Sequence, residues 1–186
     1  MCYLPQVDAA TLGETLDAWR ASFPKLGICA FLPEANKEYV ALLQAVCAQK
    51  EVPLVGAIFP ALLLQGRFHT DGVWLLCFDE MPYHALYENL PTDAQGAELK
   101  SKEIAAQVIR QLKPNEEATL FMLFDAMVPN ISTLLDHLYL NLANRVHYAG
   151  ANAGSETFQP LPCLFDGQRI AQNGVLGLVP IFSNPS

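Results

Sequence analysis

Residues 52–57 read Val-Pro-Leu-Val-Gly-Ala, and residues 146–151 read Val-His-Tyr-Ala-Gly-Ala. Both stretches are apolar, have glycine in fifth place and have the length of a buried strand. The two glycines, Gly56 and Gly150, are 94 residues apart (150 − 56). A longer internal repeat extends in both directions from this matched pair of strands.

The segments before and after these strands also match. Residues 27–32 (GICAFL) and 119–124 (TLFMLF) are both short apolar runs, and the asparagines of the following turns, Asn36 and Asn130, are again 94 residues apart. Apolar residues then recur at helical spacing in both copies, at positions Tyr39, Leu42, Leu43, Val46 and Cys47, and at Ile131, Leu134, Leu135, Leu138, Tyr139 and Leu142. Four landmarks in the same order indicate two copies of one unit.

A third strand closes each copy. Gly72 precedes the apolar run Val73–Phe78, and Gly174 precedes a second run that begins at Val175. The offset between these glycines is 102 residues (174 − 72), so the second copy has eight more residues (102 − 94) between its second and third strands.

The repeated unit therefore reads strand–helix–strand–strand. Its first two strands are continuously apolar, so we expect them to be parallel, joined by a right-handed crossover and covered on both faces. We expect the third strand to be antiparallel. The predicted fold class is α/β (mixed α+β), with mixed sheets and helices packed outside. We predict a single domain over residues 1–186, with copies at about 25–81 and 118–182 and a helical connector at 82–117.

Capping residues mark the predicted helix starts. A stripe of Leu12, Leu16, Trp19 and Phe23 predicts a first helix that Pro24 ends. Ser, Thr, Asp and Asn side chains accept hydrogen bonds from the first free amides of a helix. On this basis we predict N-caps at three positions, namely Thr11, Asn36 and Thr92.

Composition excludes several classes of protein. Apolar residues make up 52% of the chain, which is too much for a disordered protein. The formal charge is −8 (11 Lys+Arg against 19 Asp+Glu), so we expect neither nucleic acid nor an anionic membrane surface as a partner. Five cysteines, an odd number, lie mostly in apolar runs, which is typical of reduced, buried thiols. Neither a signal peptide nor a transmembrane run is evident, so we predict a cytoplasmic protein.

Charge is distributed unevenly along the chain. Residues 119–186 hold six charged side chains, whereas the other 24 fall in residues 1–118. Two interpretations remain open. The last third either forms most of the core, or it presents a surface that another domain or subunit covers.

The block VHYAGANAGSETFQPLPCLFDGQRIAQNGVLGLVPIF, residues 146–182, resembles the signature of the FIST (F-box and intracellular signal transduction) amino-terminal domain. That signature has a strand, a glycine-rich loop, an Asp-Gly turn and a closing Gly-Val strand. Residues 52–78 are similar to the family's first copy, although Ala151 stands where the family pattern has a second glycine. The resemblance implies an intracellular sensory domain for small ligands such as amino acids. It also implies a carboxy-terminal FIST half or a signalling module as a partner.

The segment Gly150-Ala151-Asn152-Ala153-Gly154-Ser155 is the best candidate for a ligand-binding loop. Small residues let a ligand approach the backbone, and successive amides can form an anion-binding nest. Asn152 and Ser155 add side-chain donors and acceptors, so we predict that Gly150, Asn152, Gly154 and Ser155 bind a carboxylate or amide ligand. The alternative is a loop in which glycine serves only packing and backbone conformation.

Other chemistry finds less support in the sequence. Cys163, His147 and Asp166 are the right residue types for a nucleophile, base and orienting carboxylate, but Cys163 lies in an apolar context that favours an inert thiol. Asp125 ends a predicted strand and is a candidate for contacting a ligand amine, or else an exposed loop carboxylate. The histidines lack metal-ligand spacing, so we expect no metal and no cofactor.

Three classes of function therefore remain. The first is a small-molecule sensory domain that passes a signal to an attached or partner module. The second is an interaction domain, or a self-associating one, that uses the charge-poor residues 119–186. The third is a Cys-dependent enzyme, although we expect the protein not to be an enzyme.

Overall fold

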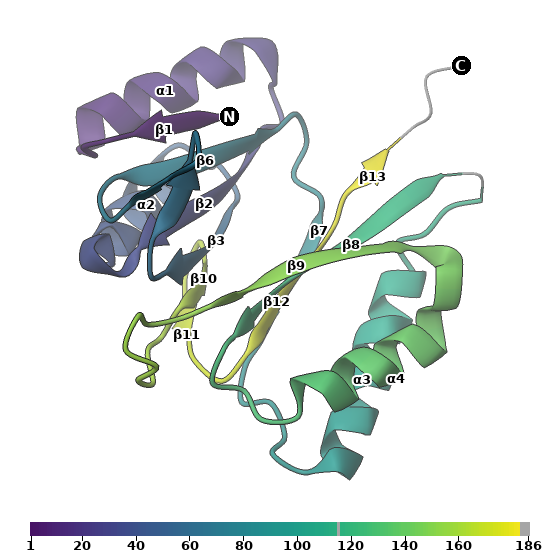
Figure 1. Ribbon diagram of the computed structural model, residues 1–186. Coiled ribbons are helices and arrows are strands. Elements are labelled where there is room, and N and C mark those ends of the chain that lie inside the picture. The colour runs from purple at the N-terminus through teal and green to yellow at the C-terminus, as the bar shows by residue number, and fades with distance from the viewer. Residues whose placement is uncertain (115, 183–186) are drawn as a thin grey trace. The chain divides into compact units, whose positions relative to one another are not determined.

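The computed structural model describes residues 1–114 and 116–182, which form two compact units (Figure 1). Unit 1 contains residues 1–81 and 153–172, and unit 2 contains residues 82–152 and those from Asn173 onward. The first boundary coincides with the end of the first predicted copy. Residues 153–172, which we assigned to the second copy, belong to unit 1.

Unit 1 is a mixed sheet with two main helices. Its sheet order is β1-β6-β2-β3-β10-β11, and a separate hairpin pairs β4 with β5. The elements are β1 (Cys2–Leu4), α1 (Ala9–Ser22), β2 (Gly27–Pro33), the short 3-10 helix η1 (Glu34–Asn36), α2 (Tyr39–Gln49), β3 (Leu54–Phe59), β4 (Leu62–Leu64), β5 (Arg67–His69), β6 (Val73–Phe78), β10 (Leu164–Asp166) and β11 (Ile170–Ala171).

The strand directions in unit 1 are those predicted from the sequence. β2 and β3 are parallel, and Ala30 pairs with Gly56. β6 is antiparallel to β2. The apolar runs are buried along most of their length, so backbone pairing and burial of side chains act together on these strands.

Gly56 has to be glycine because β2 lies very close to it. A Cβ atom at this position would lie 2.2 Å from the carbonyl oxygen of Ala30 and 2.2 Å from the ring of Phe165. β10 is antiparallel to β3 and places Phe165 directly opposite Gly56. The aromatic ring therefore fills the space that the missing side chain leaves.

Unit 2 is a second mixed sheet with its own pair of helices. In the described part of the chain the order is β13-β8-β12-β7, and β9 pairs with β8. The elements are β7 (Tyr83–Tyr87), α3 (Ala94–Ile109), β8 (Glu117–Asp125), α4 (Ile131–Leu142), the 3-10 helix η2 (Ala143–Arg145), β9 (His147–Ala153), β12 (Val175–Val179) and β13 (Ile181–Phe182).

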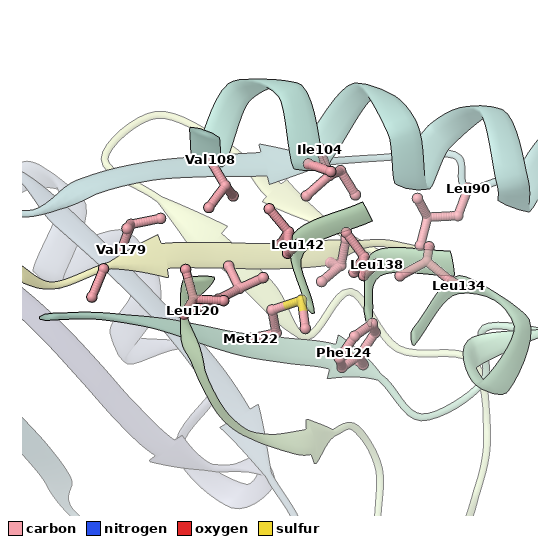
Figure 2. Close-up of a cluster of buried hydrophobic side chains, with 14 of the residues drawn as sticks. Leu90, Ile104, Val108, Leu120, Met122, Phe124, Leu134, Leu138, Leu142 and Val179 are labelled. Atoms are coloured by element: carbon pink, nitrogen blue, oxygen red, sulfur yellow. The ribbon is translucent and has the colours of Figure 1, made fainter. Parts of the chain in front are cut away.

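The core of unit 2 lies between its sheet and its two helices. Figure 2 shows side chains of α3 and α4 pointing toward those of β8 and β12. The cluster includes Ile104, Val108, Leu120, Met122, Phe124, Leu134, Leu138, Leu142 and Val179. At roughly 1.5–3 kcal/mol for each large apolar side chain that is buried, this cluster provides most of the driving force for folding unit 2.

Strand pairing in unit 2 has the same order as in unit 1. The first strand of each predicted copy, β2 or β8, lies between the second strand (β3 or β9) and the third strand (β6 or β12). The third strand is antiparallel to the first in both units. The two units therefore share one order of strand pairing around their first strands.

Several local predictions are wrong. The connector at 82–117 holds a strand as well as a helix, because Tyr83–Tyr87 pairs with β12. The N-caps of α1 and α3 are Asp8 and Asp93 rather than Thr11 and Thr92, and each aspartate accepts an amide hydrogen bond of 2.8 Å. Asn36 lies in η1, so it does not cap α2.

We predict that Gly56→Ala lowers the free energy of unfolding by about 3 kcal/mol or more, because the new methyl group meets a backbone carbonyl that cannot move aside. Gly167→Ala is the matched control. A Cβ atom at Gly167 has no atom within 4 Å, so this change should stay within about 0.5 kcal/mol. Chemical denaturation of both variants measures the difference, and equal stabilities would contradict the role given to Gly56.

Candidate functional site

The predicted binding segment is divided between the two units. Gly150 and Asn152 belong to unit 2, whereas Gly154 and Ser155 belong to unit 1. The segment is also not a loop throughout, because β9 continues to Ala153. This part of the prediction is wrong: an extended strand does not curl its amides into a nest.

Gly154 and Ser155 are engaged within unit 1. The Gly154 amide donates to the carbonyl of Ile58 over 2.8 Å, and Gly154 has a φ of 140°. Ser155 is buried, and its hydroxyl accepts the amide of Thr157 over 3.1 Å. These two residues hold the chain against β3 and shape the turn that follows.

Gly150 and Asn152 line a groove in unit 2. The groove has a volume of about 400 Å³ and lies between α4, β8 and β9. Its walls are mostly apolar, and the lining residues are Met122, Phe124, Ile131, Leu135, Tyr148, Ala149, Gly150, Ala151 and Asn152. The hydroxyl of Tyr148 is the one ionisable group among these side chains.

Gly150 allows β9 to approach β8 closely beside this groove. A Cβ atom at Gly150 would lie 2.0 Å from the carbonyl oxygen of Met122. Met122 occupies the place in TLFMLF that Ala30 occupies in GICAFL, and Ala30 makes the same approach to Gly56. A side chain at position 150 would therefore push β9 away from β8.

One row of α4 side chains borders the groove instead of entering the core. Leu134, Leu138 and Leu142 are buried, whereas Leu135 is 37% exposed and Tyr139 is 60% exposed. The Tyr139 ring packs against Tyr148, with ring centroids 5.9 Å apart. The apolar stripe of α4 is thus wider than the core of unit 2 requires.

Tyr148 fixes one end of the groove. Its hydroxyl donates a hydrogen bond of 2.8 Å to the carbonyl of Ala143. Burial, and secondarily the neighbouring Tyr139, raises the pKa of Tyr148, so the hydroxyl keeps its proton and its role as a donor.

The groove was only partly predictable from the sequence. Gly150 and Asn152 were named, but the apolar residues that form most of its walls were not. Ile131 and Leu135 belong to the apolar stripe of α4, whose spacing predicts a helix but not which of its side chains line a groove. An apolar stripe wider than the usual core face was the available signal.

Asp125 is neither a ligand contact nor an exposed carboxylate. It is buried, and its carboxylate accepts the amides of Met127 over 2.9 Å and Asn173 over 2.6 Å. Its own amide donates to the carbonyl of Gly174. Asp125 therefore joins the end of β8 to the start of β12.

The three residues considered for nucleophilic catalysis have separate surroundings. His147 is exposed in unit 2, whereas Cys163 and Asp166 are in unit 1. Cys163 is fully buried, and the Asp166 carboxylate accepts a 2.7 Å hydrogen bond from the Arg169 guanidinium. Partial burial acts to raise the pKa of Asp166, but hydrogen bonds from Gln168 and Arg169 outweigh it and hold the pKa below its usual value.

The described residues contain neither a cluster of metal ligands nor a membrane-spanning helix. Within residues 1–114 and 116–182, no group of three or more His, Cys, Asp or Glu side chains is placed to hold a metal ion. No helix in this part of the chain combines the length and the apolar character needed to cross a bilayer.

The structure thus defines a mixed α/β protein with an apolar groove beside an exposed strand. A family model described as the FIST N domain matches residues 25–184, which is most of the chain. The chain belongs to the FIST N domain family, whose members are sensory domains of signal transduction. A comparison with curated proteins gave no match.

We predict that Asp125→Ala lowers the free energy of unfolding by roughly 2–4 kcal/mol, because two backbone amides lose the buried carboxylate that accepts their hydrogen bonds. Asp136→Ala, an exposed change on α4, is the matched control and should stay within about 0.5 kcal/mol. Denaturant titration measures both, and a neutral Asp125→Ala would show that this carboxylate does not hold β8 to β12.

We also predict that thiol labelling of the folded protein modifies Cys2 and Cys77, which are partly exposed, but not Cys29, Cys47 or Cys163. Burial raises the pKa of Cys29 to about 12 and that of Cys47 to about 11, so both remain protonated at neutral pH. Mass spectrometry after brief alkylation, with unfolded protein as the control, counts the sites. Rapid labelling of Cys163 would contradict this prediction and support the hypothesis of a Cys-dependent enzyme.

Proposed function

We propose that this FIST N domain senses a small, largely apolar molecule that binds in the groove between α4 and β9. The observation that carries the proposal is the groove itself, which has mostly apolar walls and two polar side chains, those of Asn152 and Tyr148. Small-molecule sites typically combine a mostly apolar lining with a few polar groups that fix orientation.

The lining narrows the class of ligand. From the sequence we predicted an amino acid or a small carboxylate. The lining residues include no Lys or Arg to pair with a carboxylate, which argues against a small polar acid. An amino acid with an apolar side chain fits better than a dicarboxylate, because its single carboxylate is offset by its own ammonium group and its side chain would contact Ile131, Leu135 and Phe124.

The charged ends of such a ligand need polar partners or water. Asn152 is exposed and offers an amide donor and a carbonyl acceptor at the border of the groove. Because β9 is exposed from His147 to Asn152, the ammonium and carboxylate groups would keep part of their hydration there. The desolvation cost of binding is therefore lower than in an enclosed cavity.

The second candidate function is interaction with a protein through the charge-poor residues 119–186. Three large apolar side chains of α4 favour it: Leu135 is 37% exposed, Tyr139 is 60% exposed and Leu140 is 74% exposed. Exposed apolar residues that gather on one element are typical of binding surfaces.

We predict that L-leucine and L-phenylalanine raise the melting temperature of the protein, whereas succinate does not. A ligand present at 100 times its Kd stabilises the folded state by about 2.7 kcal/mol. The stabilisation should be lost in Asn152→Ala and Leu135→Ser, which remove a polar and an apolar wall of the groove.

Asn144→Ala is the matched control, since Asn144 is exposed in η2 and does not line the groove. Its response to ligand should equal that of the native protein. Equal stabilisation of the native protein, Asn152→Ala and Leu135→Ser would place the ligand elsewhere, and no response to any apolar amino acid would overturn the proposed ligand class.

A further inference from the structure

The second strand of each copy has different neighbours in the two units. β3 lies between β2 and β10, so both of its edges are paired, and it is buried from Leu54 to Ile58. In the described residues β9 pairs only with β8, and it is exposed from His147 to Asn152. One edge of β9 therefore presents backbone donors and acceptors that no described strand uses.

β9 also lacks the features that usually protect a free edge. Natural edge strands carry lysine, proline or a bulge that prevents pairing with another chain. The sequence from Tyr148 to Ala153 is Tyr-Ala-Gly-Ala-Asn-Ala, which contains no charged residue and no proline. The open edge of β9 is therefore a competent template for another strand.

Unit 1 shows what kind of strand completes such an edge. β10 runs antiparallel to β3, and its aromatic residue Phe165 lies opposite Gly56. At Gly150, the counterpart of Gly56, the three atoms nearest to a would-be Cβ are all backbone atoms of Met122. The strand that pairs with β9 should therefore place an aromatic side chain opposite Gly150.

β9 itself meets this requirement. We propose that two copies of the chain pair through antiparallel β9 strands about a twofold axis at Ala149. In this register each residue i of one chain lies opposite residue 298 − i of the other chain. Ala149 therefore lies opposite Ala149 of the other chain, and Tyr148 lies opposite Gly150 (148 + 150 = 298). The pairing thus places an aromatic residue opposite each Gly150, as β10 places Phe165 opposite Gly56.

Charge also selects this face for self-association. Each chain carries a formal charge of −8, so two chains repel each other over most of their surfaces. β9 carries no Asp, Glu, Lys or Arg, and α4 carries one such residue, Asp136. Tyr139 contacts Tyr148, so pairing also brings the exposed aromatic residues of α4 near the axis. This inference goes beyond the proposed ligand and does not depend on it.

The test is a cysteine cross-link at the axis in a Cys2→Ser, Cys77→Ser background, which removes the partly exposed thiols. Directly opposed residues of antiparallel strands have Cα atoms about 4.5–5.5 Å apart, within the range for a disulfide. Ala149→Cys should therefore give a covalent dimer under mild oxidation. Ala151→Cys is the matched control, because residue 151 lies opposite residue 147 and its thiols would be about 13 Å or more apart.

Light scattering on the native protein should show a dimer, and Ala149→Lys should convert it to a folded monomer by placing two lysines on the axis. A native protein that stays monomeric at millimolar concentration would overturn the proposal, and so would a dimer that Ala151→Cys cross-links as well as Ala149→Cys. The ligand proposal is judged separately by thermal stabilisation, so either proposal can fail while the other stands.

Discussion

In both units a glycine of the second strand lies against a backbone carbonyl of the first strand. Gly56 approaches Ala30, and Gly150 approaches Met122, each at a distance that no side chain tolerates. This close approach sets the spacing of the two strands. The order of strands follows, because the third strand takes the remaining edge of the first.

The two units then differ in how the second strand is completed. In unit 1 the edge of β3 is covered by β10, and Leu43 and Cys47 of α2 are buried. In unit 2 the apolar side chains of Leu135 and Tyr139 on α4 are exposed. Unit 2 thus keeps open a face that unit 1 closes. An open face of this kind suits a sensory domain, since a ligand or a second protein chain can complete it.

The sequence predicted the parts of the fold that depend on local pattern. Continuous apolar runs identified β2, β3, β6, β8 and β12, and spacing identified the helices. Features that depend on distant partners were missed. Tyr83–Tyr87 becomes a strand only because β12 lies beside it, and β10 reaches β3 from a segment about a hundred residues away. In the site, Gly150 and Asn152 were found because small residues are visible in sequence. The wall formed by Leu135 was not, because periodicity does not show which part of an apolar stripe the core leaves exposed.

Amide hydrogen exchange tests the central claim, that β9 is open where β3 is closed. Amides of Leu54–Ile58 should be strongly protected at every protein concentration. Those amides of Tyr148–Asn152 that face the open edge of β9, and not β8, should exchange rapidly in dilute protein and become protected as the concentration rises. Protection of the open-edge amides of β9 equal to that of β3 in dilute protein would contradict the account, as would protection of those amides that does not change with concentration.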